Sequence, residues 1–277
     1  MRISAYDCLP VLQGTIDRRI LVNYRVDPDV AAGLLPAPFR PLLVGGQAIA
    51  GACLIRLVKL RPRGLPAWLG LRLENAALRV AVEWDTDVGP KQGVFALSRY
   101  TASPLAAWAG GRLFPGVHSR ADFVTREGER NTAVAFRAAD GISLRIAGSA
   151  SEDWPADSVF ASAAEATTFF AAGSAGYSWN ERRGEFEGLS LCIPRWEAQP
   201  FAVHELASSF FDDPRRFPAG SIAFDHALVM RGVEHAWRVI DPIAAGPIAD
   251  AAGNAVHSCG CGGLAPPLSH TPSTLRV

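Results

Sequence analysis

Lysine is scarce in this sequence. Lys59 and Lys91 are the only lysines among 27 basic residues, so arginine carries nearly all of the positive charge. Lys59 alternates with apolar neighbours and Lys91 lies at an expected hairpin tip, and we expect neither amine to be desolvated. Chemistry that depends on a buried lysine is therefore disfavoured.

An excess of charge of either sign is also missing, because 27 acidic residues balance the 27 basic ones over 277 residues. Nucleic-acid affinity rests largely on a basic patch or stripe. The one basic group, formed by Arg56, Lys59, Arg61 and Arg63, is more typical of a solvated strand end. We therefore expect no nucleic-acid partner.

Long hydrophobic runs do not occur near the start of the chain. The most apolar stretch there, residues 48–55, is interrupted by Arg56 well before the roughly 18 residues that a membrane-spanning helix needs. Asp7 and Pro10 interrupt the N-terminal residues before an apolar signal segment can form. These features predict no membrane partner and a cytoplasmic location.

The five cysteines are few and scattered, which is not the pattern of a disulfide framework. Three of them, Cys8, Cys53 and Cys192, have apolar neighbours and are expected to be small buried hydrophobes. His257, Cys259 and Cys261 resemble metal ligands, but they lack a second ligand pair, and their Gly-rich surroundings favour a flexible tail. We expect no metal site and no cofactor.

The composition, with 49% hydrophobic and 19% charged residues, is that of a chain that can bury a sizeable core. Alternation and turn signals predict strands at residues 20–26, 47–60, 78–84, 93–100, 131–138, 142–147, 185–194 and 222–233. Helices are expected after the caps Asp27 and Ser103, and at residues 161–172 and 202–211. Many strands with a few short helices indicate a mainly β (α+β) fold with an antiparallel sheet closed into a barrel.

The texture of the chain changes near residue 241. From there to residue 277, glycine, alanine, proline and serine dominate, without an amphipathic period. We therefore expect a barrel domain over residues 1–240 and a flexible tail over residues 241–277.

Several short motifs occur together in a particular order. They are Asn23 to Pro28 with Leu34 to Pro36, Arg61 to Pro66, Pro115 with His118, Pro194 to Trp196 with Gln199 and Pro200, and Asp225 to Arg231 with Glu234 to Trp237. This ordered set, over roughly residues 10–240, resembles the acetoacetate decarboxylase-like superfamily, and most closely its YqjF-like branch of uncharacterised bacterial proteins. The resemblance implies an antiparallel, cone-like β-barrel with a few short helices and a ligand pocket inside the barrel.

The resemblance also bears on chemistry. In the decarboxylases of this superfamily, a lysine forms a Schiff base with a β-keto acid. The matching stretch here is residues 111–118, in which Gly116 takes the place of that lysine, and no lysine lies within twenty residues of it. Arginine cannot replace it, because a guanidinium stays protonated and does not condense with a carbonyl. We therefore expect the fold without imine-based decarboxylation.

Candidate site residues follow from the motifs and from the strand at residues 78–84. His118 is either a general acid or base or a histidine bonded to a loop carbonyl. Arg79 and Glu83 share one strand face, where they either line a cavity, with Arg79 holding a carboxylate, or meet solvent. Glu74 either reaches the pocket or caps a loop.

Further candidates come from the partner strand and the late motifs. Arg99 and Tyr100 either add a cation and a phenol to the same interior or form a structural cross-strand pair. Trp196 is a candidate substrate contact, although packing is its more typical role. Asp225 and His226 are expected to form a hydrogen bond that braces the last strand.

Together these observations predict a protein that binds an organic acid or keto acid inside a barrel. If it is an enzyme, a lyase or isomerase is expected, with proton-transfer chemistry such as enolisation, dehydration or aldol cleavage. The alternative is a non-catalytic ligand-binding or interaction protein that retains only the fold. The sequence leaves open whether the chain forms a homo-oligomer.

Overall fold

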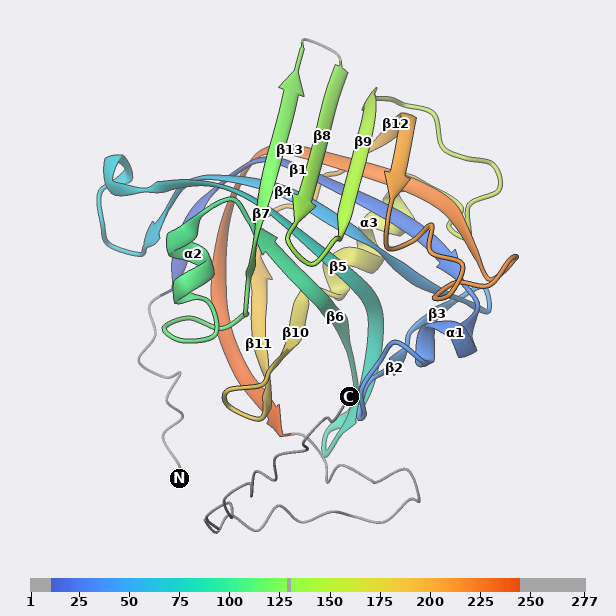
Figure 1. The fold of residues 1–277 in the computed structure, drawn as a ribbon, viewed down its shortest axis with the longest axis horizontal. Coiled ribbons are helices and arrows are strands. Elements are labelled where there is room, and N and C mark those ends of the chain that lie inside the picture. The colour runs from blue at the N-terminus through green and yellow to red at the C-terminus, as the bar shows by residue number, and fades with distance from the viewer. Residues whose placement is uncertain (1–10, 129–130, 245–277) are drawn as a thin grey trace, which may run out of the picture. The chain divides into compact units, whose positions relative to one another are not determined.

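The computed structural model describes residues 11–128 and 131–244, and strands dominate it (Figure 1). The strands are β1 (Leu12–Val26), β2 (Arg40–Pro41), β3 (Leu43–Val44), β4 (Gln47–Pro62), β5 (Leu71–Thr86), β6 (Gly89–Thr101), β7 (Ser119–Glu127), β8 (Asn131–Ala138), β9 (Ser143–Ala150), β10 (Ala175–Asn180), β11 (Glu185–Cys192), β12 (Gln199–Ser208) and β13 (Ile222–Ala244). The helices are α1 (Pro28–Ala32), α2 (Pro104–Ala109) and α3 (Ala163–Ala172), with a 3₁₀ turn η1 at Ala67–Leu69. The mainly β fold with short helices is thus confirmed.

The sheet wraps into a ring because other strands join the free edge of β6 to the free edge of β13. Strands β13, β1, β4, β5 and β6 form a continuous antiparallel band. The band is closed twice from the same edges of β6 and β13: once through β10 and β11, and once through β7, β8, β9 and β12. Both routes start from different parts of the long strand β13, which pairs with β12 near Val229 and with β11 from Ala236 onward.

Two details of the sheet differ from the sequence-based prediction. The sheet is mixed, because β6 pairs in parallel with both β10 and β7. The helix expected at residues 202–211 is wrong: most of this segment is β12, which pairs with β9. Its alanine, glutamate and leucine favour a helix locally, but pairing with a neighbouring strand outweighs this weak preference.

The predicted helix starts are confirmed. The Asp27 carboxylate accepts hydrogen bonds from the backbone N–H groups of Asp29 and Val30, with Pro28 in the first helical turn. Ser103 caps α2 in the same way, through the N–H of Ala106. Side-chain acceptors at these positions satisfy N–H groups that have no partner inside the helix.

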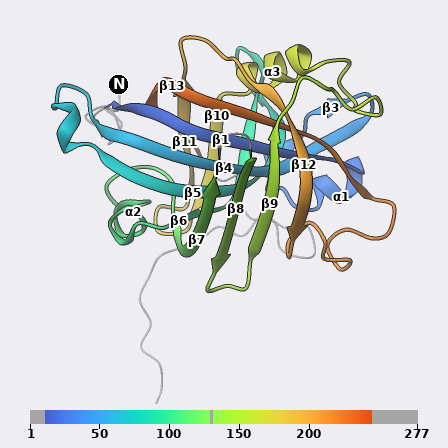
Figure 2. The same ribbon diagram turned by 90° about the horizontal axis from the view of Figure 1, so that it is seen from above.

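The band of long strands has two apolar faces. One, here called the β8 side, carries Ile20 and Val22, which pack in one cluster with Val134 and Ile146 of β8 and β9. The other, the α3 side, carries Leu21, Ile49, Ala81 and Leu228, which pack with Ala166 and Phe170 of α3. Figure 2 shows α3 and strands β7–β9 on opposite sides of the band. Consecutive strand residues therefore go to different environments.

The last strand runs beyond the expected domain boundary. β13 continues to Ala244, so residues 241–244 belong to the sheet and not to a tail. The rest of the expected tail, including His257, Cys259 and Cys261, lies outside the described residues. None of the described helices has the length and apolar character needed to cross a membrane.

Candidate functional site

Three arginines from three strands gather on the α3 side of the band. Arg19 of β1 has its guanidinium 5.0 Å from the ring centre of Trp196, and Arg79 of β5 has its guanidinium 4.7 Å from that of Phe170. Arg99 of β6 lies directly opposite Ala77, two residues before Arg79. We refer to Arg19, Arg79 and Arg99 as the arginine cluster.

Two small side chains form a floor between these arginines. Cys53 of β4 and Ala77 of β5 lie directly opposite each other, and both keep partial exposure although they sit in the middle of the sheet. The Nε–H of Arg19 donates to the Cys53 Sγ at 3.4 Å. Cys53 also lies close enough to Arg79 and Arg99 to influence the pKa of both guanidinium groups. The three cations therefore surround a short-chained, accessible floor.

Several buried N–H groups of the arginine cluster have no acceptor among the described residues. Arg79 is 4% exposed, and its Nη2 donates to the Asn23 Oδ1 at 2.7 Å. Within residues 11–128 and 131–244, its Nε and Nη1, the Nε of Arg99 and the Nη1 of Arg19 have no hydrogen-bond partner. A buried donor without an acceptor is unfavourable by about 1–3 kcal/mol. Such an arrangement is typical of a site that receives an anion.

The pKa values of the cluster reflect this setting. Burial lowers the pKa of Arg79 to about 10; the nearby Cys53 opposes this shift, and Arg19 adds to it. Burial likewise lowers the pKa of Arg99 to about 10, against the opposing influence of Glu187. Both guanidinium groups remain protonated at neutral pH, so the site is cationic.

A chain of hydrogen bonds holds Arg79 in place. The Asp225 Oδ2 accepts from the His226 Nδ1 at 2.6 Å, and the His226 Nε2 accepts from the Asn23 Nδ2 at 3.0 Å. Asn23 in turn accepts from Arg79. These roles fit a neutral His226, whose pKa is lowered by burial despite the neighbouring carboxylate. The expected hydrogen bond between Asp225 and His226 is present, and it also positions Arg79.

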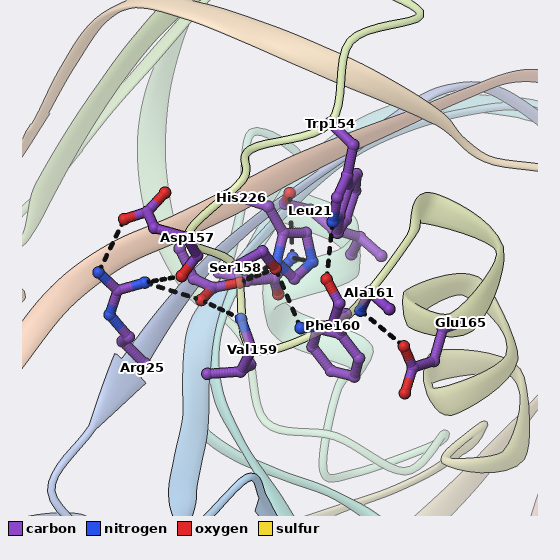
Figure 3. A network of polar contacts seen from close by, with 12 residues as sticks. Leu21, Arg25, Trp154, Asp157, Ser158, Val159, Phe160, Ala161, Glu165 and His226 are labelled. Carbon is purple, nitrogen blue, oxygen red and sulfur yellow. Dashed lines mark hydrogen bonds and ion pairs between the residues drawn. The ribbon is translucent and has the colours of Figure 1, made fainter.

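The segment between β9 and α3 folds over this chain (Figure 3). The Arg25 guanidinium donates to the Asp157 carbonyl and pairs with its carboxylate, at 2.6 and 3.0 Å. The Ser158 hydroxyl donates to the Asp225 Oδ2 at 2.7 Å. The Trp154 ring packs against His226 with ring centres 4.9 Å apart and the ring planes tilted by 43°. These contacts fix the covering segment, so that α3 can place Phe170 on Arg79.

His118 lies at the Arg99 end of the cluster. Its Nδ1 is 2.8 Å from the Gly116 carbonyl oxygen, which can only accept, so the neutral ring carries its proton on Nδ1 and leaves Nε2 as an acceptor. Burial and, next, Arg99 lower the pKa of His118 to about 4, while the Gly116 carbonyl opposes the shift. The ring is therefore neutral at pH 7. His118 therefore contacts a loop carbonyl, as one of the two alternatives expected, and at the same time lies beside Arg99.

Gly116 also lies beside Arg99 and His118. Its φ is +98°, and a Cβ there would stand 3.5 Å from both the Arg99 Cδ and the His118 Cε1. Its N–H donates to the Glu187 Oε2 at 2.9 Å, and Glu187, which is 1% exposed, also accepts from Asn180 at 2.7 Å. The position that the resemblance assigns to a lysine thus borders the arginine cluster.

The structure separates the remaining candidates from this site. Tyr100 lies on the β8 side, where its hydroxyl donates to Asp140 at 2.9 Å, so it does not share an interior with Arg99; adjacent strand residues point to opposite faces. Glu74 pairs with Arg18 and Arg56, at 2.7 and 2.5 Å. Glu83 pairs with Arg40 near the surface, at 2.8 Å.

Trp196, Cys53 and Glu187 show what sequence reasoning gained and missed. Trp196 contacts the site through its ring contact with Arg19. Cys53 was expected to be a buried hydrophobe, yet it forms part of the floor. No signal in the sequence sets Arg19 and Glu187 apart, because β1 also carries Asp17, Arg18 and Arg25, and β11 also carries Glu185.

The alternative sites to consider among the described residues are surface hollows and metal-ligand clusters. A surface hollow of about 800 Å³ is lined by Glu83, Trp84, Lys91 and Tyr177, among others, and includes no member of the arginine cluster. Within residues 11–128 and 131–244, no group of three or more His, Cys, Asp or Glu side chains is placed to hold a metal ion.

Comparisons with known proteins agree with this architecture. The model of a family described as an uncharacterized conserved protein, DUF2071, matches residues 14–221. No curated protein matches the chain.

Solved structures share the fold at low identity. An acetoacetate decarboxylase from Legionella pneumophila is similar with a TM-score of 0.56 and 13% identity, over 87% of this chain and 91% of that one. An acetoacetate decarboxylase-like enzyme from Sphingomonas wittichii RW1 is similar with a TM-score of 0.54 and 13% identity, over 86% and 92%. The enduracididine biosynthesis enzyme MppR, in its complex with pyruvate, gives 0.50 and 13%, over 83% and 90%.

Proposed function

The chain belongs to the DUF2071 family and has the fold of the acetoacetate decarboxylases, and from this premise we propose that it binds a small organic acid or keto acid at the arginine cluster. The observation that carries the proposal is the set of buried guanidinium N–H groups without acceptors around the floor of Cys53 and Ala77. A carboxylate supplies planar oxygen acceptors that match the guanidinium fork. Arg79, held by Asn23, is its anchor.

His118 is the acid or base of this site. Its neutral ring offers Nε2 as a proton acceptor beside Arg99. A bound carboxylate offsets the positive charge of Arg99 and so raises the pKa of His118 from about 4 toward neutrality, which makes it a stronger base when the ligand is present. Enolisation, dehydration or aldol cleavage are the reaction classes that such a proton transfer serves.

Imine chemistry has no place in the proposal. Lys59 and Lys91 are both exposed, and Gly116 stands where the resemblance places the lysine. Borohydride reduction in the presence of pyruvate or acetoacetate is therefore expected to trap no adduct. An adduct on either lysine would contradict this part of the proposal.

Cys53 provides a local test of binding. Pyruvate, which MppR binds, is expected to slow the alkylation of Cys53 by iodoacetamide without slowing that of Cys192, as followed by peptide mass spectrometry. Arg79→Gln should remove the protection, whereas Arg145→Gln, in an exposed ion pair with Glu205, should keep it. Equal alkylation of Cys53 with and without saturating pyruvate and acetoacetate would contradict binding at this site.

The second candidate is a binding protein without chemistry. Gly116 favours it, because the chain has the fold without the lysine that serves the decarboxylases it resembles. Pyruvate in D₂O separates the two: exchange of its methyl protons that depends on His118 supports proton transfer. Protection of Cys53 without such exchange supports binding alone.

A further inference from the structure

We propose that the ligand of the arginine cluster is a dicarboxylate, held by Arg79 and Arg99 at one carboxylate and by Arg19 at the other. This inference rests on the proposed function, because it specifies the acid that the same site takes. It gives Arg19 the role of holding the second carboxylate, because Arg19 and Arg79 lie on opposite sides of Cys53 along β4.

The balance of charge at the site favours two negative charges on the ligand. Three guanidinium groups surround the floor, whereas Glu187 is the carboxylate that acts on Arg99, and it is shared with Arg183 at 3.4 Å. Asp225 is held by Arg25 and Ser158. With Glu187 counted against Arg99, one ligand carboxylate leaves one of the three guanidinium charges uncompensated in a largely desolvated place, whereas two carboxylates compensate all of them.

The strand register places the charges apart, which favours two separate carboxylates over one doubly charged group. Along β4, Arg79 lies opposite Gly51 and Arg19 lies opposite Ile55, with Cys53 midway between them. Four strand residues span about 13 Å, so the two arginines approach the floor from opposite sides. A short diacid lying over Cys53 and Ala77 reaches both.

Neighbouring side chains hold the guanidinium groups of both Arg79 and Arg19 in position. At one end, Asn23 accepts from Arg79 and Phe170 covers its face. At the other, Trp196 covers Arg19 and the Cys53 sulfur accepts from its Nε, while its buried Nη1 has no acceptor in the part of the chain that the structure describes. An aromatic face on each guanidinium leaves its edge as the hydrogen-bonding surface.

Calorimetric titration of the full chain with a matched pair of acids tests the proposal. Glutarate and monomethyl glutarate share a carbon skeleton but carry two and one negative charges. Glutarate is expected to bind at least tenfold more tightly. In Arg19→Gln, the ratio of the two affinities should fall toward one, and Arg19→Lys, which keeps the charge, should restore part of it. Arg145→Gln is the matched control and should keep the ratio of the unmodified protein.

The outcomes separate this inference from the proposed function. Equal binding of the two acids, or a ratio that Arg19→Gln leaves unchanged in a folded protein, would overturn the dicarboxylate while leaving organic-acid binding intact. Inorganic phosphate that displaces glutarate with equal affinity would show a single anion position and also overturn it. Absence of binding by either acid, together with unprotected Cys53, would overturn both.

Discussion

Arg18 and Arg19 are neighbours in β1, yet they lie in opposite electrostatic surroundings. Arg18 points to the β8 side, is fully buried, and pairs with Glu74 and Glu127 at 2.7 and 2.6 Å. Arg56 joins the same two carboxylates. Arg19 points to the α3 side, where its Nη1 has no acceptor among the described residues. The charges of Arg18 and Arg56 are thus neutralised by carboxylates of the protein, whereas, within residues 11–128 and 131–244, the charge of Arg19 is not paired in this way.

This difference separates two uses of buried arginine. On the β8 side, Arg18 and Arg56 pair with Glu74 and Glu127, and these ion pairs join β1, β4, β5 and β7, although the Nε of Arg18 has no acceptor among the described residues. On the α3 side, three guanidinium groups gather around the floor, where Asn23 of β1, Phe170 of α3 and Trp196 between β11 and β12 contact two of them. Removing one partner of a buried ion pair lowers the stability of a fold, whereas an unpaired buried charge lowers it while present and is frequent at functional sites.

The largest expected effect comes from breaking the neutralised side. Arg18→Met should lower the free energy of unfolding by about 3–5 kcal/mol, because it leaves Glu74 and Glu127 partly buried with one cation fewer. Urea denaturation measures it. Arg145→Met, in the exposed pair with Glu205, should change stability by less than about 1 kcal/mol. A loss below 1 kcal/mol for Arg18→Met would remove the contrast between the two sides.

Acid sharpens the comparison, because the two sides respond in different pH ranges. On the α3 side, His118 has a pKa of about 4 in the folded chain and about 6.5 when unfolded, so the unfolded chain binds the extra proton. Stability should therefore be full above about pH 6.5 and fall, on the order of 1–2 kcal/mol, as the pH drops to about 4. On the β8 side, Arg18 and Arg56 offset burial and lower the pKa of Glu127, so its contribution is lost only below about pH 4.5.

Denaturation midpoints measured from pH 7.5 to 3.5 test this assignment. His118→Gln should flatten the decline between pH 6.5 and 4 and leave the decline below pH 4.5 in place. Buried His235, whose pKa burial also lowers to about 4, contributes in the same window, so part of the slope should remain. An identical profile in His118→Gln would contradict the assignment.

Removing a charge from the α3 side should have the opposite sign to removing Arg18. Arg99→Met takes away a desolvated cation, so the unliganded protein should gain about 1 kcal/mol in the free energy of unfolding. The same change should weaken the protection of Cys53 by pyruvate. A loss of stability comparable to that of Arg18→Met would mean that Arg99 is a structural charge.

Local signals in the sequence predicted the parts of the fold that depend on neighbouring residues. Asp27 and Ser103 marked helix starts because capping needs only a few adjacent N–H groups. The alternation at residues 78–84 placed Arg79 and Ala81 on one face, which the structure bears out on the α3 side. His118 followed from the resemblance.

The rest depends on contacts distant in sequence. The parallel pairing of β6 with β10, and the approach of Glu187 to Gly116, arise only when the ring closes. Arg19 lies outside the strand expected at residues 20–26, because β1 extends back to Leu12 through its pairing with β4 and β13. Tyr100 shows the converse: simple alternation with Arg99 already indicated the opposite face.

Tyr100 therefore provides the smallest and most selective test of the two sides. Tyr100→Phe removes the hydrogen bond to Asp140, so stability should fall by about 0.5–1 kcal/mol, measured by urea denaturation. Burial and this hydrogen bond raise the Tyr100 pKa to about 12, so the phenol stays neutral across the tested range. Because the ring packs on Phe136 at 5.1 Å, on the β8 side, pyruvate should protect Cys53 in the variant as fully as in the unmodified protein. Loss of that protection would place Tyr100 in the binding site after all, and would show that the two faces of the band do not act independently.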